Sequence, residues 1–117
     1  MLRPLGSNVD ISGKVFFNDG ITPFVAPAGC TAQVLLFNYD TGSFNGQMSG
    51  LDSSGRYDIS DVDPRFCPYH LLVRCINNTD QQMVYNQSII PTYSEEFNVT
   101  AGTDMVMNVT TSRMLTN

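Results

Sequence analysis

Four stretches decide the fold: Ile11-Ser-Gly-Lys-Val15, Ala28-Gly-Cys-Thr-Ala-Gln-Val34, Leu51-Asp-Ser-Ser-Gly-Arg-Tyr-Asp-Ile59 and Tyr69-His-Leu-Leu-Val73. In each, apolar residues alternate with polar or small residues, which is the period of a β-strand with one buried face. The Asp52-Ser-Ser-Gly55 segment has the composition of a tight turn, so we expect it to join two strands as a hairpin. Together the stretches predict a small β-sandwich.

The second of these strands is apolar on both faces. Cys30, Ala32, Val34 and Leu36 point one way by parity, while Leu35 and Phe37 give the other face some apolar character. A strand of this kind is usually covered on its second side as well. The sequence therefore predicts that something packs over the outer face here.

The rest of the chain continues the period of a strand. We expect a first strand at 9–17, another at 82–90, and a closing hairpin that pairs 96–100 with 104–111. If Asn98 and Asn108 point outward, the core receives Phe97, Val99, Met105, Met107 and Val109. No stretch has a sustained helical stripe of apolar residues. The sequence thus predicts an all-β fold, a sandwich of seven to eight short antiparallel strands.

Composition limits the domain count and the partners. The 117 residues suit one domain, which we place at 9–117 behind an N-terminal arm at 1–8. Only 15% of residues are charged, the net charge is −5 and Lys and Arg do not cluster, so we expect no nucleic-acid partner. No apolar run reaches the roughly 18 residues that a membrane span needs.

Three features favour an extracellular location. Lys14 is the only lysine, and polar uncharged residues are abundant. The chain contains four Asn-x-Ser/Thr glycosylation sequences, whereas chance predicts about two. They begin at Asn77, Asn86, Asn98 and Asn108. We therefore predict N-glycans at exposed positions of a secreted or cell-surface protein.

The three cysteines predict one disulfide and one leftover thiol. Cys30 begins one strand and Cys75 ends another, so in an antiparallel pair the two meet at the same edge of the core. This bridge would close a long loop and contribute about 2–4 kcal/mol. Cys67 is left for an intermolecular bridge or a buried free thiol, and the buried thiol is favoured. Cys67 and His70 supply only a fragment of a zinc site.

The quoted stretches, followed by Val99-Thr-Ala-Gly-Thr103, resemble the carboxypeptidase regulatory-like, or transthyretin-like, β-sandwich superfamily over about residues 9–111. The resemblance implies an Ig-like or transthyretin-like sandwich that acts as a non-catalytic extracellular module. Members serve as appendages of enzymes, stalk repeats, adhesin segments and carriers. The hydrolase branch uses several histidines and a Tyr-Arg-Gly-Ser terminus, whereas this chain has only His70 and ends Thr111-Ser-Arg-Met-Leu-Thr-Asn117. By parity, His70 lies with Leu72 on the side of its strand away from the core. We therefore predict no catalytic residue and no cofactor.

Two other groups of residues are candidate sites. Asp52, Asp58, Asp61 and Asp63 could gather around calcium, but the ligand spacing of a calcium loop is missing, so turn-forming aspartates and no metal are favoured. A sugar-binding platform could use aromatic rings near loops. These are Tyr39, Phe44, Tyr57, Tyr85 and Tyr93. They are scattered through separate segments and the chain has no Trp, so positions in the core or at its rim are favoured.

Assembly is the function that the sequence favours. A sheet edge accepts a strand from another subunit, and such a contact between successive copies does not close. The donor would be the arm and the start of the first strand, with apolar residues Leu2, Leu5, Val9 and Ile11. We predict a self-assembling fibre or surface-layer subunit, partnered by its own copies or other surface proteins. The alternatives are an arm that is only a leader or a remnant of tag removal, and a monomeric secreted module that binds a glycan or protein.

Overall fold

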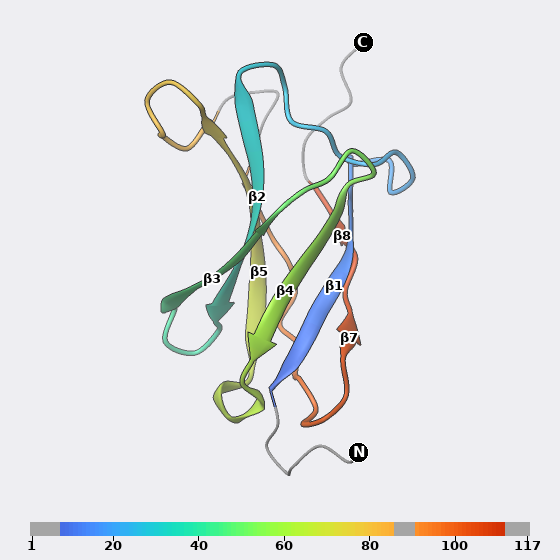
Figure 1. Ribbon diagram of the computed structural model, residues 1–117, viewed down its shortest axis with the longest axis vertical. Coiled ribbons are helices and arrows are strands. Elements are labelled where there is room, and N and C mark those ends of the chain that lie inside the picture. The colour runs from blue at the N-terminus through green and yellow to red at the C-terminus, as the bar shows by residue number, and fades with distance from the viewer. Residues whose placement is uncertain (1–7, 86–90, 112–117) are drawn as a thin grey trace.

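The computed structural model describes residues 8–85 and 91–111, which form eight β-strands and one short 3-10 turn at Pro64–Phe66 (Figure 1). The all-β fold and the strand number therefore agree with the prediction. The strands are β1 (Val9–Phe16), β2 (Cys30–Asn38), β3 (Phe44–Gly50), β4 (Arg56–Val62), β5 (Tyr69–Asn77), β6 (Thr92–Tyr93), β7 (Met105–Val106) and β8 (Val109–Thr110).

The strands form two sheets, which lie on two sides of the molecule (Figure 1). One sheet has the order β4-β1-β7, and β8 also pairs with β1. The other has the order β3-β2-β5-β6. The apolar core lies between them and takes fully buried side chains from both, such as Ile11 and Ile59 on one side and Val34 and Leu71 on the other. Burial of each such side chain contributes about 1.5–3 kcal/mol.

The predicted closing hairpin is wrong. β7 and β8 pair in parallel with β1, while Phe97 makes an isolated bridge with Tyr69 of the other sheet. The segment between Phe97 and β7 therefore passes from one sheet to the other. The predicted facing still holds, because Phe97, Val99 and Val109 are buried and Asn98 and Asn108 are exposed. Alternation fixed which side chains face the core, but it did not fix the partner strand.

The predicted hairpin at 52–55 is also wrong as a pairing, although its turn is present. Asp52 Oδ1 accepts the main-chain N–H groups of Ser54 and Arg56 at 2.8 and 2.9 Å, and Gly55 has φ +75°. The strands on either side then separate, since β3 pairs with β2 and β4 pairs with β1. The turn is thus an arch between the two sheets.

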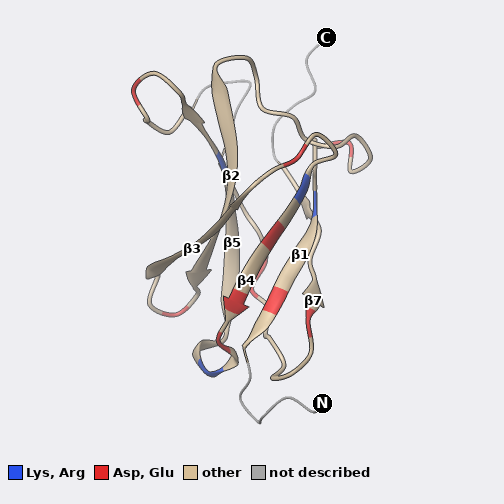
Figure 2. Ribbon diagram, in the orientation of Figure 1, with Lys and Arg blue, Asp and Glu red and all other residues tan. Residues whose placement is uncertain are grey.

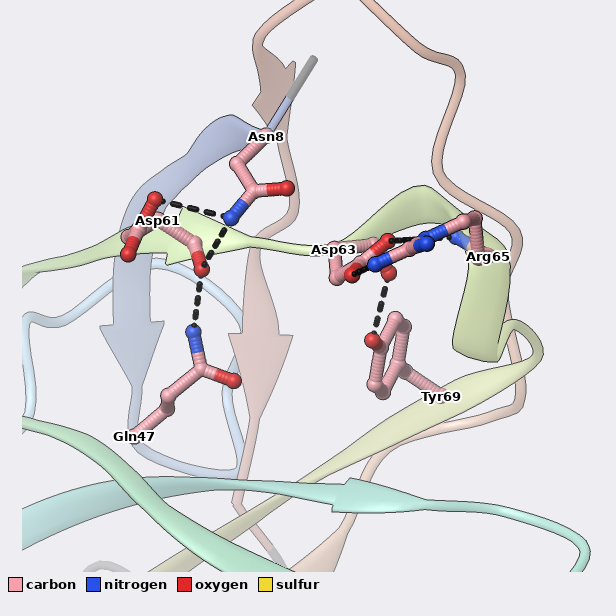
Figure 3. Close-up of polar contacts among 6 residues, drawn as sticks. All are labelled: Asn8, Gln47, Asp61, Asp63, Arg65 and Tyr69. Atoms are coloured by element: carbon pink, nitrogen blue, oxygen red, sulfur yellow. Dashed lines mark hydrogen bonds and ion pairs between the residues drawn. The ribbon is translucent and has the colours of Figure 1, made fainter. Parts of the chain in front are cut away.

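Side chains bridge the two strands where they separate. The Gln47 side-chain amide on β3 donates to the main-chain carbonyls of Ser60 and Asp61 on β4, at 3.1 and 2.7 Å. Figure 3 shows Gln47 and Asn8 converging on Asp61. The register between β1 and β4 is irregular at this point, and these bonds supply donors to main-chain carbonyls of β4.

Gly13 of β1 allows a close approach of the chain at Met107. A Cβ built on Gly13 would lie 2.7 Å from the carbonyl carbon of Met107 and closer still to its oxygen. The same oxygen accepts a hydrogen bond from the Tyr57 hydroxyl, and burial raises the pKa of Tyr57 well above its ordinary value. The glycine in the first quoted stretch is therefore required by packing between β1 and the segment that joins β7 to β8.

The predicted assembly arm falls largely outside the described residues. Leu2 and Leu5 lie there, as does most of the predicted strand at 82–90; within 82–85 the structure has only a bridge between Met83 and Ile76. Val9 and Ile11 belong to β1 and are 1% and 0% exposed, so they are core residues of this molecule and not part of an arm.

The predicted Cys30–Cys75 disulfide is not formed in the structure. The register places Cys30 opposite Asn77 and Cys75 opposite Ala32, so the two cysteines are diagonal neighbours. Diagonal neighbours lie about 7–8 Å apart, whereas the Cα atoms of a disulfide usually lie about 4.4–6.8 Å apart. Cys67 packs against the core, and its Sγ accepts the Val99 N–H at 3.1 Å.

Candidate binding surface

The outer face of the β3-β2-β5-β6 sheet brings together side chains that are far apart in the sequence. The register places Phe37 of β2 opposite both His70 of β5 and Phe44 of β3. Tyr93 of β6 lies opposite Leu72 of β5 and therefore points to the same side as His70. The prediction that His70 and Leu72 face away from the core agrees with this register.

Five rings on this side form one cluster, which we call the aromatic face: Phe37, Tyr39, Phe44, His70 and Tyr93. The Tyr93 ring stacks on His70, with centroids 4.9 Å apart and planes 16° apart. Tyr39 meets His70 edge-on at 5.3 Å and 79°. Phe37 lies 5.9 Å from His70 and 5.3 Å from Phe44, which links the group into a single surface.

The aromatic face lies over a second layer of buried apolar side chains. Leu35 and Leu72 point to the outer side of the sheet, yet they are only 2% and 6% exposed. Their cross-strand neighbours on this side include Met48 and Tyr93. The expectation that something covers the outer side of β2 is therefore met in part by these neighbours.

The outermost members of the aromatic face remain open to solvent. Tyr93 is 59% exposed, Tyr39 is 48% exposed and Phe44 is 39% exposed. Isolated exposed apolar residues are ordinary on a protein surface, but a contiguous apolar patch is typical of an interaction site. This clustering is what distinguishes these rings from other exposed side chains such as Ile21 and Tyr85.

Hydrogen bonds hold Tyr39 in place at the end of β2. Its main-chain N–H donates to Pro68 O at 2.9 Å, and the neighbouring Asn38 side-chain amide donates to Phe66 O at 2.5 Å. Asn38 Oδ1 also accepts the Thr41 N–H at 2.9 Å. The turn that carries Tyr39 is therefore tied to the segment leading into β5, which keeps Tyr39 beside His70.

Three polar groups on the aromatic face are available to a ligand. In the described part of the chain, neither the hydroxyls of Tyr39 and Tyr93 nor the imidazole nitrogens of His70 form a hydrogen bond. Burial lowers the pKa of His70 below its ordinary value, so the ring is neutral at neutral pH and has one donor and one acceptor nitrogen. The surface thus combines apolar rings with unoccupied hydrogen-bonding groups.

Charge is distributed unequally between the sheets. The four strands of the β3-β2-β5-β6 sheet contain a single charged residue, Arg74. Its Nε donates to Gln33 Oε1 at 3.0 Å. In Figure 2, β2 and β3 are uniformly tan, whereas β1 and β4 carry red and blue segments. The aromatic face is therefore an almost uncharged surface.

A shallow hollow lies over the opposite sheet. Its lining includes Lys14 of β1 and Arg56 of β4, which are opposite each other in the register. Asp52 and Asp58 line the same hollow, so the positive and negative groups offset one another. This surface has no aromatic cluster and provides a natural comparison for the aromatic face.

The four aspartates that were considered as calcium ligands make separate local contacts. Asp52 caps the 52–55 turn. The main-chain N–H of Asp58 donates to Ser49 Oγ at 3.1 Å, and Asp61 Oδ1 accepts a hydrogen bond from the Asn8 side-chain amide at 2.8 Å. Asp63 pairs with Arg65 at 2.8 Å (Figure 3). Among the described residues, no three His, Cys, Asp or Glu side chains are placed to hold a metal ion.

These contacts shift the ionisation of the groups involved. Hydrogen bonds from the Arg56 and Ser54 main chain lower the pKa of Asp52, and the Arg65 side chain lowers that of Asp63. The Tyr69 hydroxyl donates to Asp63 O at 2.6 Å, and burial raises the pKa of Tyr69 to about 12. All three groups stabilise turns and strand ends at the edges of the sandwich.

The other predicted site residues lie apart from the aromatic face. Tyr57 is buried in the core, and Tyr85 is 71% exposed outside the cluster. Asn98 and Asn108 are exposed, while Asn77 is half-buried and its Oδ1 accepts the Thr79 N–H at 2.8 Å. The fourth glycosylation sequence, at Asn86, falls outside the described residues.

Comparison with known proteins defines only the fold. No family model matches the sequence, and no curated protein matches it. Among solved structures, the chain is similar to part of a 9R-lipoxygenase from Cyanothece, with a TM-score of 0.51 and 16% sequence identity. The similarity covers 97% of this chain but 18% of the lipoxygenase chain. At this identity it indicates a shared fold and carries no activity over. In the described residues, no helix has the length and apolar character needed to cross a membrane.

Proposed function

We propose that this chain is a non-catalytic extracellular module that binds a glycan or a protein through its aromatic face. The observation that carries the proposal is the cluster of five rings that includes His70, in which neighbouring ring centroids lie 4.9–5.9 Å apart. Rings with an apolar body and a polar end are enriched where proteins meet ligands, because they provide contact area with little loss of conformational entropy.

The remaining parts of the proposal have separate support. Exposed glycosylation sequences at Asn98 and Asn108 and the single lysine favour an extracellular location. The two-sheet fold suits the Ig-like, carboxypeptidase regulatory-like class that the sequence resembles. A non-catalytic role is favoured because His70 packs against the rings of Tyr39 and Tyr93 as part of an aromatic cluster.

An array carrying extracellular glycans and extracellular proteins tests the proposal. The double variant Tyr39→Ala/Tyr93→Ala removes two exposed rings, and Tyr85→Ala is the control, because Tyr85 is an exposed tyrosine that lies outside the cluster. We expect wild-type protein and Tyr85→Ala to bind the same array members and the double variant to lose that binding. Binding that survives in the double variant, or no binding by wild-type protein, would contradict the proposal.

A second candidate function is a self-assembling fibre or surface-layer subunit, which the open edge of β3 favours. Within the described residues β3 pairs only with β2, and most of its residues are exposed, including Phe44 and Met48 at 39% and 40%. An unpaired edge of this kind can accept a strand from a second copy. The donor that the sequence offers is the arm at 1–8, with Leu2 and Leu5.

Negative-stain electron microscopy of material from the native source tests this second candidate. Deletion of residues 1–7 keeps Asn8 and its hydrogen bond to Asp61. Leu2→Ser/Leu5→Ser preserves the length of the arm and removes its apolar side chains. Strand exchange predicts fibres in the wild-type sample and none in either variant. Particles of monomer size in all three samples would count against it.

A further inference from the structure

We infer that the ligand of the aromatic face is a neutral saccharide, bound by stacking on Tyr93 and by hydrogen bonds to the polar groups around it. This inference rests on the proposed function, because it assigns a ligand class to the same surface. It is carried by three features of that surface: its charge, its ring geometry and its unoccupied hydrogen-bonding groups.

The charge of the surface favours an uncharged ligand. Arg74 is the only charged residue on the strands of this sheet, and Gln33 already accepts a hydrogen bond from it. A sulfated or carboxylated glycan is normally held by several Arg or Lys side chains, which pair with its anionic groups. The aromatic face lacks such a set, while a neutral ligand needs none.

The rings form an open stacking platform that is bordered on one side by a second tyrosine ring. Tyr93 lies parallel to His70 and is the more exposed of the two, so its outer side is open to a ligand. Tyr39 stands at 79° to His70 and therefore borders that platform. The face of an aromatic ring carries negative charge density, which attracts the C–H groups on the face of a sugar ring.

The polar groups on the aromatic face favour a saccharide over an apolar protein surface as the ligand. An apolar surface placed here would bury the Tyr39 and Tyr93 hydroxyls and the His70 nitrogens without partners, and each buried unsatisfied group costs binding energy. A sugar presents C–H groups on its faces and hydroxyls around its rim. It therefore satisfies the rings and the polar groups together.

Titration with soluble oligosaccharides tests the inference. Because the chain has no Trp, its intrinsic fluorescence comes from its tyrosines and reports directly on ligands that contact them. The probes are cellohexaose and chitohexaose as neutral saccharides, and a heparin hexasaccharide as the anionic comparison. We expect saturable binding of at least one neutral probe, little dependence on salt and weaker or no binding of the heparin probe.

Variants test whether the saccharide probe binds at the aromatic face. Tyr93→Ala is expected to weaken binding of the neutral probe by about tenfold, the scale of one aromatic contact. Tyr85→Ala should leave the affinity unchanged, and Tyr93→Phe should retain stacking but lose the hydroxyl contribution. Circular dichroism of each variant establishes that it is folded.

The outcomes distinguish the inference from the proposed function. One outcome is that neither hexasaccharide and no neutral glycan on the array binds, while array proteins bind the wild-type protein but not Tyr39→Ala/Tyr93→Ala. The ligand is then a protein, so the inference fails and the proposed function stands. Tighter binding of heparin would also overturn the inference. If no ligand depends on the aromatic face, both fail.

Discussion

At the scale of single residues, Gly13 in the pattern Ile11-Ser-Gly-Lys-Val15 is required by its contact with Met107, which is distant in the sequence. The neighbours of Gly13 in β1 alternate between core and surface as any strand does, and only the approach of Met107 explains why no side chain is present. Because the atoms facing Gly13 are main-chain atoms, they cannot move aside as the end of a flexible side chain could.

Gly13→Ala is therefore expected to destabilise the fold. The added Cβ collides with the Met107 carbonyl and forces β1 and the β7–β8 segment apart, so we expect a loss of about 1–3 kcal/mol in the free energy of unfolding. Urea denaturation measures the change in midpoint. Gly50→Ala is the matched control, since its Cβ meets nothing within 4 Å and Gly50 also lies in a strand. Equal midpoints for the two variants would refute the packing role of Gly13.

At the scale of elements, alternation in the sequence predicted the positions of β1, β2, β4 and β5. The antiparallel pair of strands assumed for Cys30 and Cys75 is present as β2 and β5, but the two predicted hairpins are not. The turn at Asp52 was predicted from its composition, yet a turn between two strands serves a hairpin and an arch equally well. The strands at the C-terminal end were placed in a hairpin because they are adjacent in sequence. Their parallel pairing with β1 depends on the shape of the whole core, which local alternation does not encode.

The candidate surface was predictable only in part, for the same reason. Parity correctly placed Phe37 and His70 on the side away from the core. Their meeting depends on the β2–β5 register, and the addition of Tyr39, Phe44 and Tyr93 depends on a turn and on two edge strands. The aromatic residues are scattered in sequence, so the interpretation as core or rim residues was right for Tyr57 but missed the cluster that Tyr39, Phe44 and Tyr93 join.

At the scale of the whole molecule, the two outer faces have different chemistry. The face of the β4-β1-β7 sheet carries charges of both signs, whereas the face of the β3-β2-β5-β6 sheet carries rings and almost no charge (Figure 2). A charged, mixed surface keeps a protein soluble, and an aromatic surface left open favours association with a ligand. This asymmetry makes the aromatic face the surface on which the proposed function depends.

A two-dimensional NOE spectrum of the aromatic protons tests most directly whether these rings form one surface in solution. With centroids 4.9 and 5.3 Å from His70, the rings of Tyr93 and Tyr39 are predicted to give cross-peaks to the His70 ring protons, and the peaks to each tyrosine should disappear in the corresponding Tyr→Ala variant. Cross-peaks from His70 only to its neighbours in sequence would contradict the aromatic face and the binding role built on it.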